Sequence, residues 1–334
     1  MMIDYPRICE DIFQELSSRK REVLEKRFGL TTDTAFTLQA IGNDIGITRE
    51  RVRQIENDAF EQLRETQKDR LDKAFQYFSD YFKEQGGLRE ESKLLEDLGK
   101  DKFKNHVLLL LNLGNDFSKS RETEEFYSFW TIESESLEQA RNVIKNIIKE
   151  FKQNNSPMGI DEVGEKIDFN LKTPILISYI DISKIIFQSP FGNYGLVQWP
   201  EINPRGIKDQ AYLVLKKENK PLHFTEIAEL ISKLPSISRD ILPESVHNEV
   251  IRNNRFVLVG RGIYALKKWG YESGTVKEII VSILKKSKKS LSKEEVIKMV
   301  LEQRQVKEST IALNLQNKKV FEKDKKGRYS LLKK

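Results

Sequence analysis

Apolar residues recur every three or four positions along most of this chain, which is the spacing of amphipathic helices that bury one face. Short segments that end in a tyrosine, a small residue and an apolar residue interrupt this pattern. A glycine turn precedes the last three segments, at Gly192, at Gly260 with Gly262, and at Gly327. The pattern predicts a mainly α protein with small β-hairpins. The closing segments are Tyr127-Ser128-Phe129, Tyr194-Gly195-Leu196, Tyr264-Ala265-Leu266 and Tyr329-Ser330-Leu331.

The closing segments lie 67, 70 and 65 residues apart, and the same order of elements precedes each of the last three. An amphipathic helix comes first, then a polar turn, a short helix, a third helical stretch and the hairpin. Three helices followed by a two-stranded wing is the winged-helix plan, a relative of the helix-turn-helix. The first helices are predicted at 137–152, 207–218 and 276–286, and the second helices at 159–167, 225–234 and 292–303.

Residues 67–134 have the same length as one of these copies and are predicted to be a degenerate fourth one, with helices near 68–84 and 102–113. Five aromatic residues at helical spacing between Asp69 and Phe82 indicate packing in a core or against another domain, although a partner helix is an alternative. Linkers near 133–137, 199–205 and 270–275 contain Ser, Pro or Gly and would permit relative motion. The predicted domains are therefore 1–66, 67–134, 135–200, 203–270 and 274–334.

Residues 37–56 have the form of two short helices joined by a tight turn. Spacing places four charged or amide side chains on one face of the second helix and three apolar side chains on the opposite face. Thr48 directly precedes this helix and is a good N-cap. The segment predicts a DNA-reading helix that is held against a partner by its apolar face. The polar face carries Arg49, Glu50, Arg53 and Gln54, and the apolar face carries Val52, Ile55 and Ala59.

The runs 16–30 (Leu-Ser-Ser-Arg-Lys-Arg-Glu-Val-Leu-Glu-Lys-Arg-Phe-Gly-Leu) and 48–56 (Thr-Arg-Glu-Arg-Val-Arg-Gln-Ile-Glu) carry a resemblance. Residues 10–65 resemble region 4 of the bacterial sigma-70 family. The resemblance implies a helix in the major groove of promoter −35 DNA and docking on the β flap of RNA polymerase. Arginine pairs with guanine, glutamine with adenine, and glutamate accepts from cytosine. The implied base contacts are Arg49, Glu50, Arg53 and Gln54, and the implied phosphate contacts are Thr37, Thr48 and Arg51. The alternative is a surface helix with solvated ion pairs.

The segment 203–270 carries a second resemblance, to the HARE-type helix-turn-helix domain. Three phrases support it: 207–215 (Ile-Lys-Asp-Gln-Ala-Tyr-Leu-Val-Leu), 221–227 (Pro-Leu-His-Phe-Thr-Glu-Ile) and 255–266 (Arg-Phe-Val-Leu-Val-Gly-Arg-Gly-Ile-Tyr-Ala-Leu). That domain occurs in the delta subunit of some bacterial RNA polymerases and in chromatin and restriction proteins. The resemblance implies a contact with polymerase or with DNA.

Positive charge is concentrated at the end of the sequence. Residues 275–334 contain 17 Lys or Arg against 7 Asp or Glu, whereas the formal net charge of the whole chain is +6. A concentrated basic segment is typical of sequence-independent contact with phosphates, and a solubilising surface is the alternative. The densest cluster is Lys285, Lys286, Lys288 and Lys289, and these four lysines are predicted to contact phosphates.

The remaining chemistry is sparse. One cysteine, Cys9, and three separated histidines offer no metal site, and no glycine-rich phosphate loop is present, so we expect no cofactor, no metal and no enzymatic activity. The longest apolar run, Val107 to Leu111, is too short to cross a bilayer, and no secretory signal is visible. A cytoplasmic, nucleoid-associated protein without a membrane partner is the expectation.

These observations predict a DNA-binding transcription factor that recognises promoter −35-like DNA, docks on RNA polymerase, or does both. No pattern of the promoter-melting region 2 is visible, so we do not expect a self-sufficient initiation factor. One alternative is a polymerase-independent regulator or DNA-architecture protein. Another is the DNA-targeting subunit of a restriction or DNA-processing system.

Overall fold

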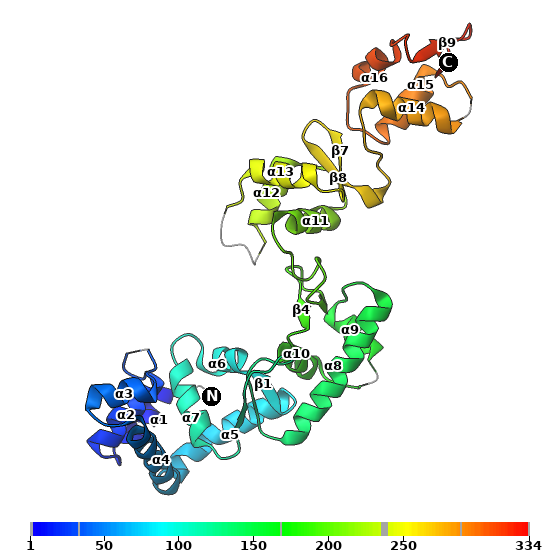
Figure 1. Ribbon diagram of the computed structural model, residues 1–334. Coiled ribbons are helices and arrows are strands. Elements are labelled where there is room, and N and C mark those ends of the chain that lie inside the picture. Colours follow the sequence, from blue (N-terminus) through cyan, green and yellow to red (C-terminus); the bar gives the residue numbers. More distant parts are fainter. Residues whose placement is uncertain (1–2, 33, 168, 235–239, 288, 333–334) are drawn as a thin grey trace. The chain divides into compact units, whose positions relative to one another are not determined.

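The computed structural model describes residues 3–32, 34–167, 169–234, 240–287 and 289–332 (Figure 1). It confirms a mainly helical protein with small antiparallel strand pairs. The chain divides into two compact units: residues 1–188 with 192–197, and residues 189–191 with 198–334. Within the described residues, no helix is both long enough and apolar enough to cross a membrane.

The first unit begins with the helix-turn-helix and continues into a second and a third group of elements. Its helices are α1 (Tyr5–Phe13), α2 (Ser18–Phe28), α3 (Leu38–Ile45), α4 (Arg49–Thr66), α5 (Lys68–Glu84), α6 (Glu91–Gly99), α7 (Lys104–Leu113), α8 (Ser134–Asn154), α9 (Ile160–Lys166) and α10 (Thr173–Asp181). Its strands are β1 (Leu88–Glu90), β2 (Ser118–Ser120), β3 (Phe129–Thr131), β4 (Ile186–Gln188) and β5 (Tyr194–Leu196).

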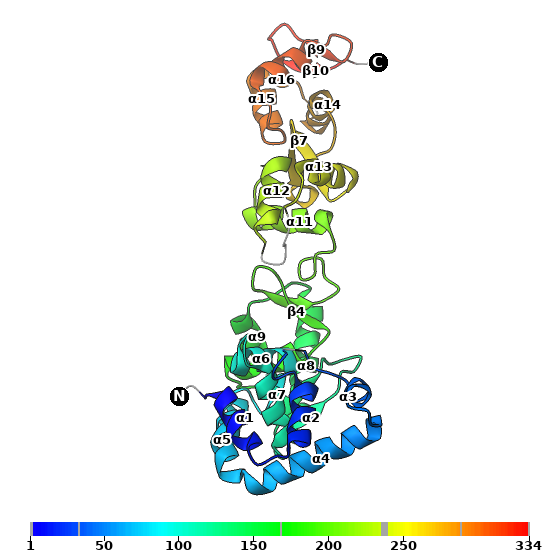
Figure 2. The ribbon, with the colours of Figure 1, turned by 90° about the vertical axis from the view of Figure 1, so that its left-hand side faces the viewer.

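One hydrophobic core runs through α1, α2, α4, α5 and α7 (Figures 1 and 2). Phe13 of α1, Phe78 of α5 and Leu110 of α7 are all buried in it. Hydrogen bonds reinforce the junction: Arg64 donates to the carbonyl oxygens of Asn112 and Leu113, at 2.9 and 2.8 Å, and satisfies the open end of α7. Residues 1–66 therefore close only a small core of their own, around Val23, Ile41 and Val52, and bury most of their other apolar side chains against residues 67–113.

Backbone and side-chain bonds also join the second group of elements to the third. The Tyr127 N–H donates to the Ile182 carbonyl at 2.9 Å, and Ser178 Oγ donates to the Leu88 carbonyl at 2.6 Å. Arg89 is nearly buried and forms ion pairs with Asp97, at 3.0 Å, and with Asp181, at 2.7 Å. These contacts cross the predicted linker near 133–137 and tie both groups together.

The group at 67–134 has the same order of elements as the group at 203–270, with a helix α6 that the sequence did not predict. Its sheet has three strands in the order β1-β3-β2, because β1, before α6, pairs with the closing strand β3. The closing strand begins at Phe129, whereas Tyr127 bonds outside this sheet to Ile182. Trp130 on β3 is buried and its indole N–H donates to Glu91 at 2.9 Å.

The second unit contains two successive groups, each with three helices and an antiparallel strand pair. The first has α11 (Ile207–Glu218), β6 (Leu222–His223), α12 (Phe224–Ser232), α13 (Pro243–Arg252), β7 (Phe256–Gly260), β8 (Ile263–Leu266) and the 3-10 turn η1 (Lys267–Trp269), and its sheet order is β6-β8-β7. The second has α14 (Val276–Ser287), α15 (Lys293–Leu301), α16 (Glu308–Leu315), β9 (Phe321–Lys323) and β10 (Tyr329–Leu331).

The segment at 270–275, predicted as a linker, is bonded to the last group. Arg304 is buried and donates to the carbonyl oxygens of Glu272 and Gly274. The Gln305 N–H donates to the Val259 carbonyl of β7 at 2.7 Å. A guanidinium that satisfies two linker carbonyls restricts the motion that the Gly and Ser content of the linker predicts.

Candidate nucleic-acid interface

The turn between α3 and α4 depends on two glycines. Gly46 ends α3 with φ +71°, the left-handed conformation that glycine adopts without strain. A Cβ on Gly42 would lie 2.6 Å from the Ile47 carbonyl oxygen, so only glycine allows the turn to pass this close. The Ile47 N–H donates to the Gly42 carbonyl at 2.9 Å and closes the turn. The predicted pair of short helices is confirmed here.

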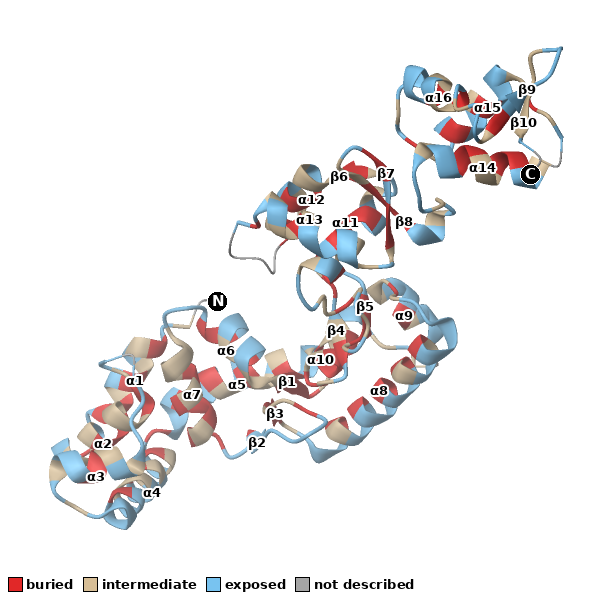
Figure 3. Ribbon diagram, turned by 45° about the horizontal axis from the view of Figure 1, so that its top comes forward, coloured by how far each residue is buried: buried red, intermediate tan, exposed pale blue. Residues whose placement is uncertain are grey.

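The apolar face of α4 is buried as its spacing predicts. Val52 contacts a small core with Val23 of α2 and Ile41 of α3, and all three are fully buried. Ile55 is partly buried against this core, and Ala59 contacts the larger shared core. Burial of these side chains fixes the rotation of α4 about its axis, so the opposite face points to solvent (Figure 3).

The predicted base-contacting side chains are all exposed, and three of them hydrogen-bond to a neighbour on the same face. Arg53 forms an ion pair with Glu50 at 2.7 Å, and Arg51 donates to Gln54 Oε1 at 3.0 Å. The hydrogen bond from Arg53 lowers the pKa of Glu50, which therefore stays ionised, and the same bond raises the pKa of Arg53. Arg49, beside them, is also exposed. A bound DNA base would have to form a new hydrogen bond for each of these internal bonds that it breaks.

Both predicted threonine contacts serve as helix caps. Thr48 Oγ1 accepts from the Arg51 N–H at 3.2 Å, and Thr37 Oγ1 accepts from the Ala40 N–H at 3.1 Å. The predicted N-cap at Thr48 is confirmed. Each hydroxyl keeps its own proton for donation, so a phosphate oxygen at either helix N-terminus would also meet free N–H groups and the positive end of the helix dipole.

Sequence reasoning missed the polar side chains that position the two helices. Arg27 of α2 forms an ion pair with Glu56 of α4 at 3.2 Å. Arg19 donates to the Ile45 carbonyl at the end of α3, at 2.9 Å, and Lys20 donates to Gln62 of α4 at 2.9 Å. Periodicity marks these residues only as a solvated face, because the partners lie 26 to 42 residues away.

The basic cluster at the end of the chain is divided by the fold. Lys285 is exposed on α14, and Lys286 forms an ion pair with Glu272. Lys288 lies outside the described residues. Lys289 lies beside the turn between β9 and β10 and shares an open hollow of about 680 Å³ with residues of that turn. Within this hollow Asp324 organises the turn by accepting from the N–H groups of two residues. The cationic residues of the hollow are Lys289, Lys325, Lys326 and Arg328.

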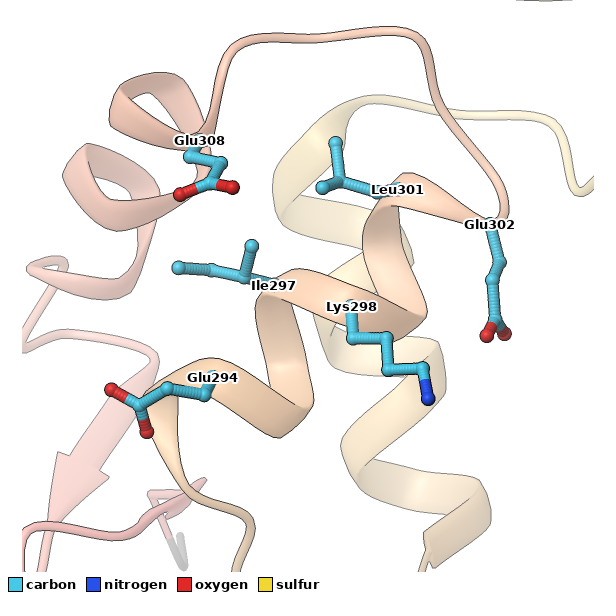
Figure 4. Close-up of a pocket in the computed structure, with 6 residues that line it drawn as sticks. All are labelled: Glu294, Ile297, Lys298, Leu301, Glu302 and Glu308. Carbon is cyan, nitrogen blue, oxygen red and sulfur yellow. The ribbon is translucent and has the colours of Figure 1, made fainter.

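A second hollow, along α15 and the start of α16, is lined mainly by acidic and apolar side chains. This hollow of about 510 Å³ has Ile297 and Leu301 as its apolar part, with Glu308 facing them from α16 (Figure 4). Glu294 and Glu302 stand at its edges with Lys298 (Figure 4). The described lining of the hollow at the strand turn thus has four cations and one carboxylate, whereas that of the α15–α16 hollow has three carboxylates and one lysine.

Comparison with known proteins identifies the first domain. Residues 12–65 match the family model for Sigma-70, region 4. The chain is 54% identical over 50 residues to RNA polymerase sigma factor RpoS of Coxiella burnetii. It is 42% identical over 65 residues to RNA polymerase sigma factor RpoD of Neisseria gonorrhoeae, and 43% identical over 63 residues to RpoD of Helicobacter pylori.

These matches cover a small part of each protein. They span 15–19% of this chain and 9–14% of the length of the relatives. Residues 12–65 therefore form a sigma-70 region 4 domain, which includes α3 and nearly all of α4.

Proposed function

We propose that this protein is a DNA-binding transcription factor that reads promoter −35-like duplex DNA with α4 and docks on RNA polymerase core. The observation that carries the proposal is the exposed row of Arg49, Glu50, Arg53 and Gln54 on the second helix of a sigma-70 region 4 domain. The role is binding, with no chemical step. The proposed site of action is the nucleoid.

The reading face gains specificity from the bonds that it already makes. Glu50 and Arg53 hydrogen-bond to each other in the free protein. They therefore add affinity for DNA only where its bases offer an equally good acceptor and donor. A guanine beside Arg53 supplies two acceptors, and a cytosine beside Glu50 supplies a donor. A wrong base breaks the internal pair without replacement, and each good bidentate contact corresponds to roughly 5- to 150-fold discrimination.

The C-terminal groups would add contacts of lower specificity. The order of three helices and a strand pair at 203–270 and 274–334 supports the HARE-type and winged-helix assignments, which we keep as proposals. In the last group the strand turn with Lys325 and Lys326 is suited to phosphates. The third helix, α16, carries no Lys or Arg and exposes Leu313, so it is better suited to protein contact.

A polymerase-independent regulator is the second candidate, and the shared core favours it. Protein docking usually uses an exposed apolar centre. In the described part of residues 1–66, Phe36 is the only exposed large apolar side chain. Helices α5 and α7 cover the apolar face of this domain. Docking on the β flap through this domain would therefore need Phe36, polar contacts, or movement of α7.

Purification of the tagged full-length protein from its native cells distinguishes the two candidates. The lysate is treated with nuclease so that DNA does not bridge separate proteins, and the eluate is assayed for the polymerase subunits. Stoichiometric β and β′ subunits are the expected result. Their absence, together with retained binding to a −35-like duplex, would establish the polymerase-independent regulator. Equal affinity of the protein for that duplex and for a scrambled one would contradict the reading role of α4.

A further inference from the structure

A basic groove lies along the solvent face of α8, outside the region 4 domain and outside the basic end of the chain. One face of α8 is buried through Val143, Ile147 and Phe151 (Figure 3). The groove on its other side has a volume of about 770 Å³. Phe169, from the segment after α9, closes one side of it. The polar side chains that line it are Asn142, Lys145, Asn146, Lys149, Lys152 and Gln153.

No carboxylate is among the described residues that line the groove with the three lysines. Positions separated by four and three residues fall on one helical face, so the row from Lys145 to Lys152 is about 10.5 Å long. Among the described residues, these lysines take part in no ion pair, whereas Lys104, Lys119 and Lys166 of the same unit each bind an acidic partner. Like charges at such spacing repel and destabilise a helix slightly, so the row is not explained by the stability of α8.

We propose that the α8 groove binds the phosphate backbone of double-stranded DNA, a contact separate from the base-reading face of α4. Each polar side chain that lines the described part of the groove carries N–H donors, which suit phosphate oxygens. Each lysine of the row is a separate cation that can neutralise one phosphate of the duplex. The inference rests on the proposed DNA-binding function and adds a sequence-independent anchor to it.

The salt dependence of DNA binding by the full-length protein tests this inference. The test variant combines Lys145→Gln, Lys149→Gln and Lys152→Gln. The control variant combines Lys104→Gln, Lys119→Gln and Lys166→Gln, which removes the same charge from paired lysines of the same unit. Affinity for a −35-like duplex and for a scrambled duplex is measured by fluorescence anisotropy across a salt series. The fold of each variant is checked by its thermal unfolding.

Three lost phosphate contacts should make the slope of log affinity against log salt shallower by about 2.7. The loss should be equal on both duplexes, because phosphate contacts carry no sequence information. The control variant should keep most of the slope. An unchanged slope in the test variant would overturn the inference and leave the groove to an acidic protein. Equal changes in both variants would also overturn it, as an effect of net charge. Absence of duplex binding by the unaltered protein would instead overturn the proposed function itself.

Discussion

Truncation of Leu110 on α7 should open the region 4 domain, although Leu110 lies outside the matched residues 12–65. Its side chain is fully buried in the core that also holds Phe13 and Cys9 of α1. Leu110→Ala removes three side-chain carbons from a site where neighbours on several helices cannot all collapse inward. The expected loss is about 2–5 kcal/mol in the free energy of unfolding.

The single cysteine of the chain provides the assay. Cys9 is buried, and burial raises the pKa of its thiol to about 12, so the folded state reacts slowly with a maleimide at pH 8. If α1 opens together with the shared core, labelling follows the population of the open state. A loss of 2–5 kcal/mol then raises the labelling rate by roughly 30- to 5,000-fold.

Leu215→Ala is the matched control, because Leu215 is equally buried but belongs to the core of the second unit. It should change the labelling of Cys9 by less than about twofold, because the two cores share no residue. An unchanged labelling rate in a destabilised Leu110→Ala variant would refute the reasoning. It would show that α1 opens without α7 and that residues 1–66 are held together by their own contacts.

Three further perturbations test the reading face, the buried ion pairs and the thiol. Arg53→Ala should reduce the preference for a −35-like over a scrambled duplex by roughly 5- to 150-fold, with little change on the scrambled one, in a competition binding assay. Arg89→Met should lower the free energy of unfolding by roughly 2–4 kcal/mol, measured by chemical denaturation. Asp97 and Asp181 would both lose their cationic partner, and Asp181 would stay partly buried. Between pH 8 and 10 the wild type should lose about 1.4 kcal/mol more stability than Cys9→Ala. The unfolded thiol releases its proton near pH 9, whereas the folded thiol keeps it until about pH 12, so this contribution is present below pH 9 and lost above it.

Arg21 supplies one control for both arginine variants, because it is exposed on α2, outside α4's reading face, and its ion pair with Glu25 is local, with the partners four positions apart along the helix. Arg21→Ala should leave sequence preference unchanged and alter stability by less than about 1 kcal/mol. Equal losses on both duplexes for Arg53→Ala would contradict base reading. A stable Arg89→Met variant would show that hydrophobic replacement compensates for the network, and parallel pH profiles for wild type and Cys9→Ala would contradict a thiol that stays protonated in the fold.

Local pattern was sufficient for most of the helices, although not for α6, and for the reading face. The predicted helix near 68–84 coincides with α5, and the predicted helix at 207–218 coincides with α11. Opposite faces of α4 followed from spacing alone, because a helix with 3.6 residues per turn separates them without reference to the remainder of the fold. The region 4 domain was recognisable because its motif is contiguous in sequence.

Pattern was insufficient wherever two distant segments share an environment. The aromatic spacing between Asp69 and Phe82 indicated a buried face, but it did not show that the region 4 domain covers that face. Arg89 and Asp181 are 92 residues apart, and neither belongs to a recognisable motif. The basic cluster around Lys285–Lys289 reads as one surface in sequence, whereas the fold pairs Lys286 and places Lys289 beside the β9–β10 turn.

The sequence by itself determined most of the helices, the face of each that avoids water, and which helix carries a DNA-reading motif. These properties arise from interactions within a few residues along the chain. Only the tertiary structure decided that residues 1–66 and 67–113 share one large core, and that the lysines of α8 line an open groove with no acidic partner in the part of the chain that the structure describes. Hydrophobic burial is non-directional, so an apolar face specifies that it will be covered but not by which segment.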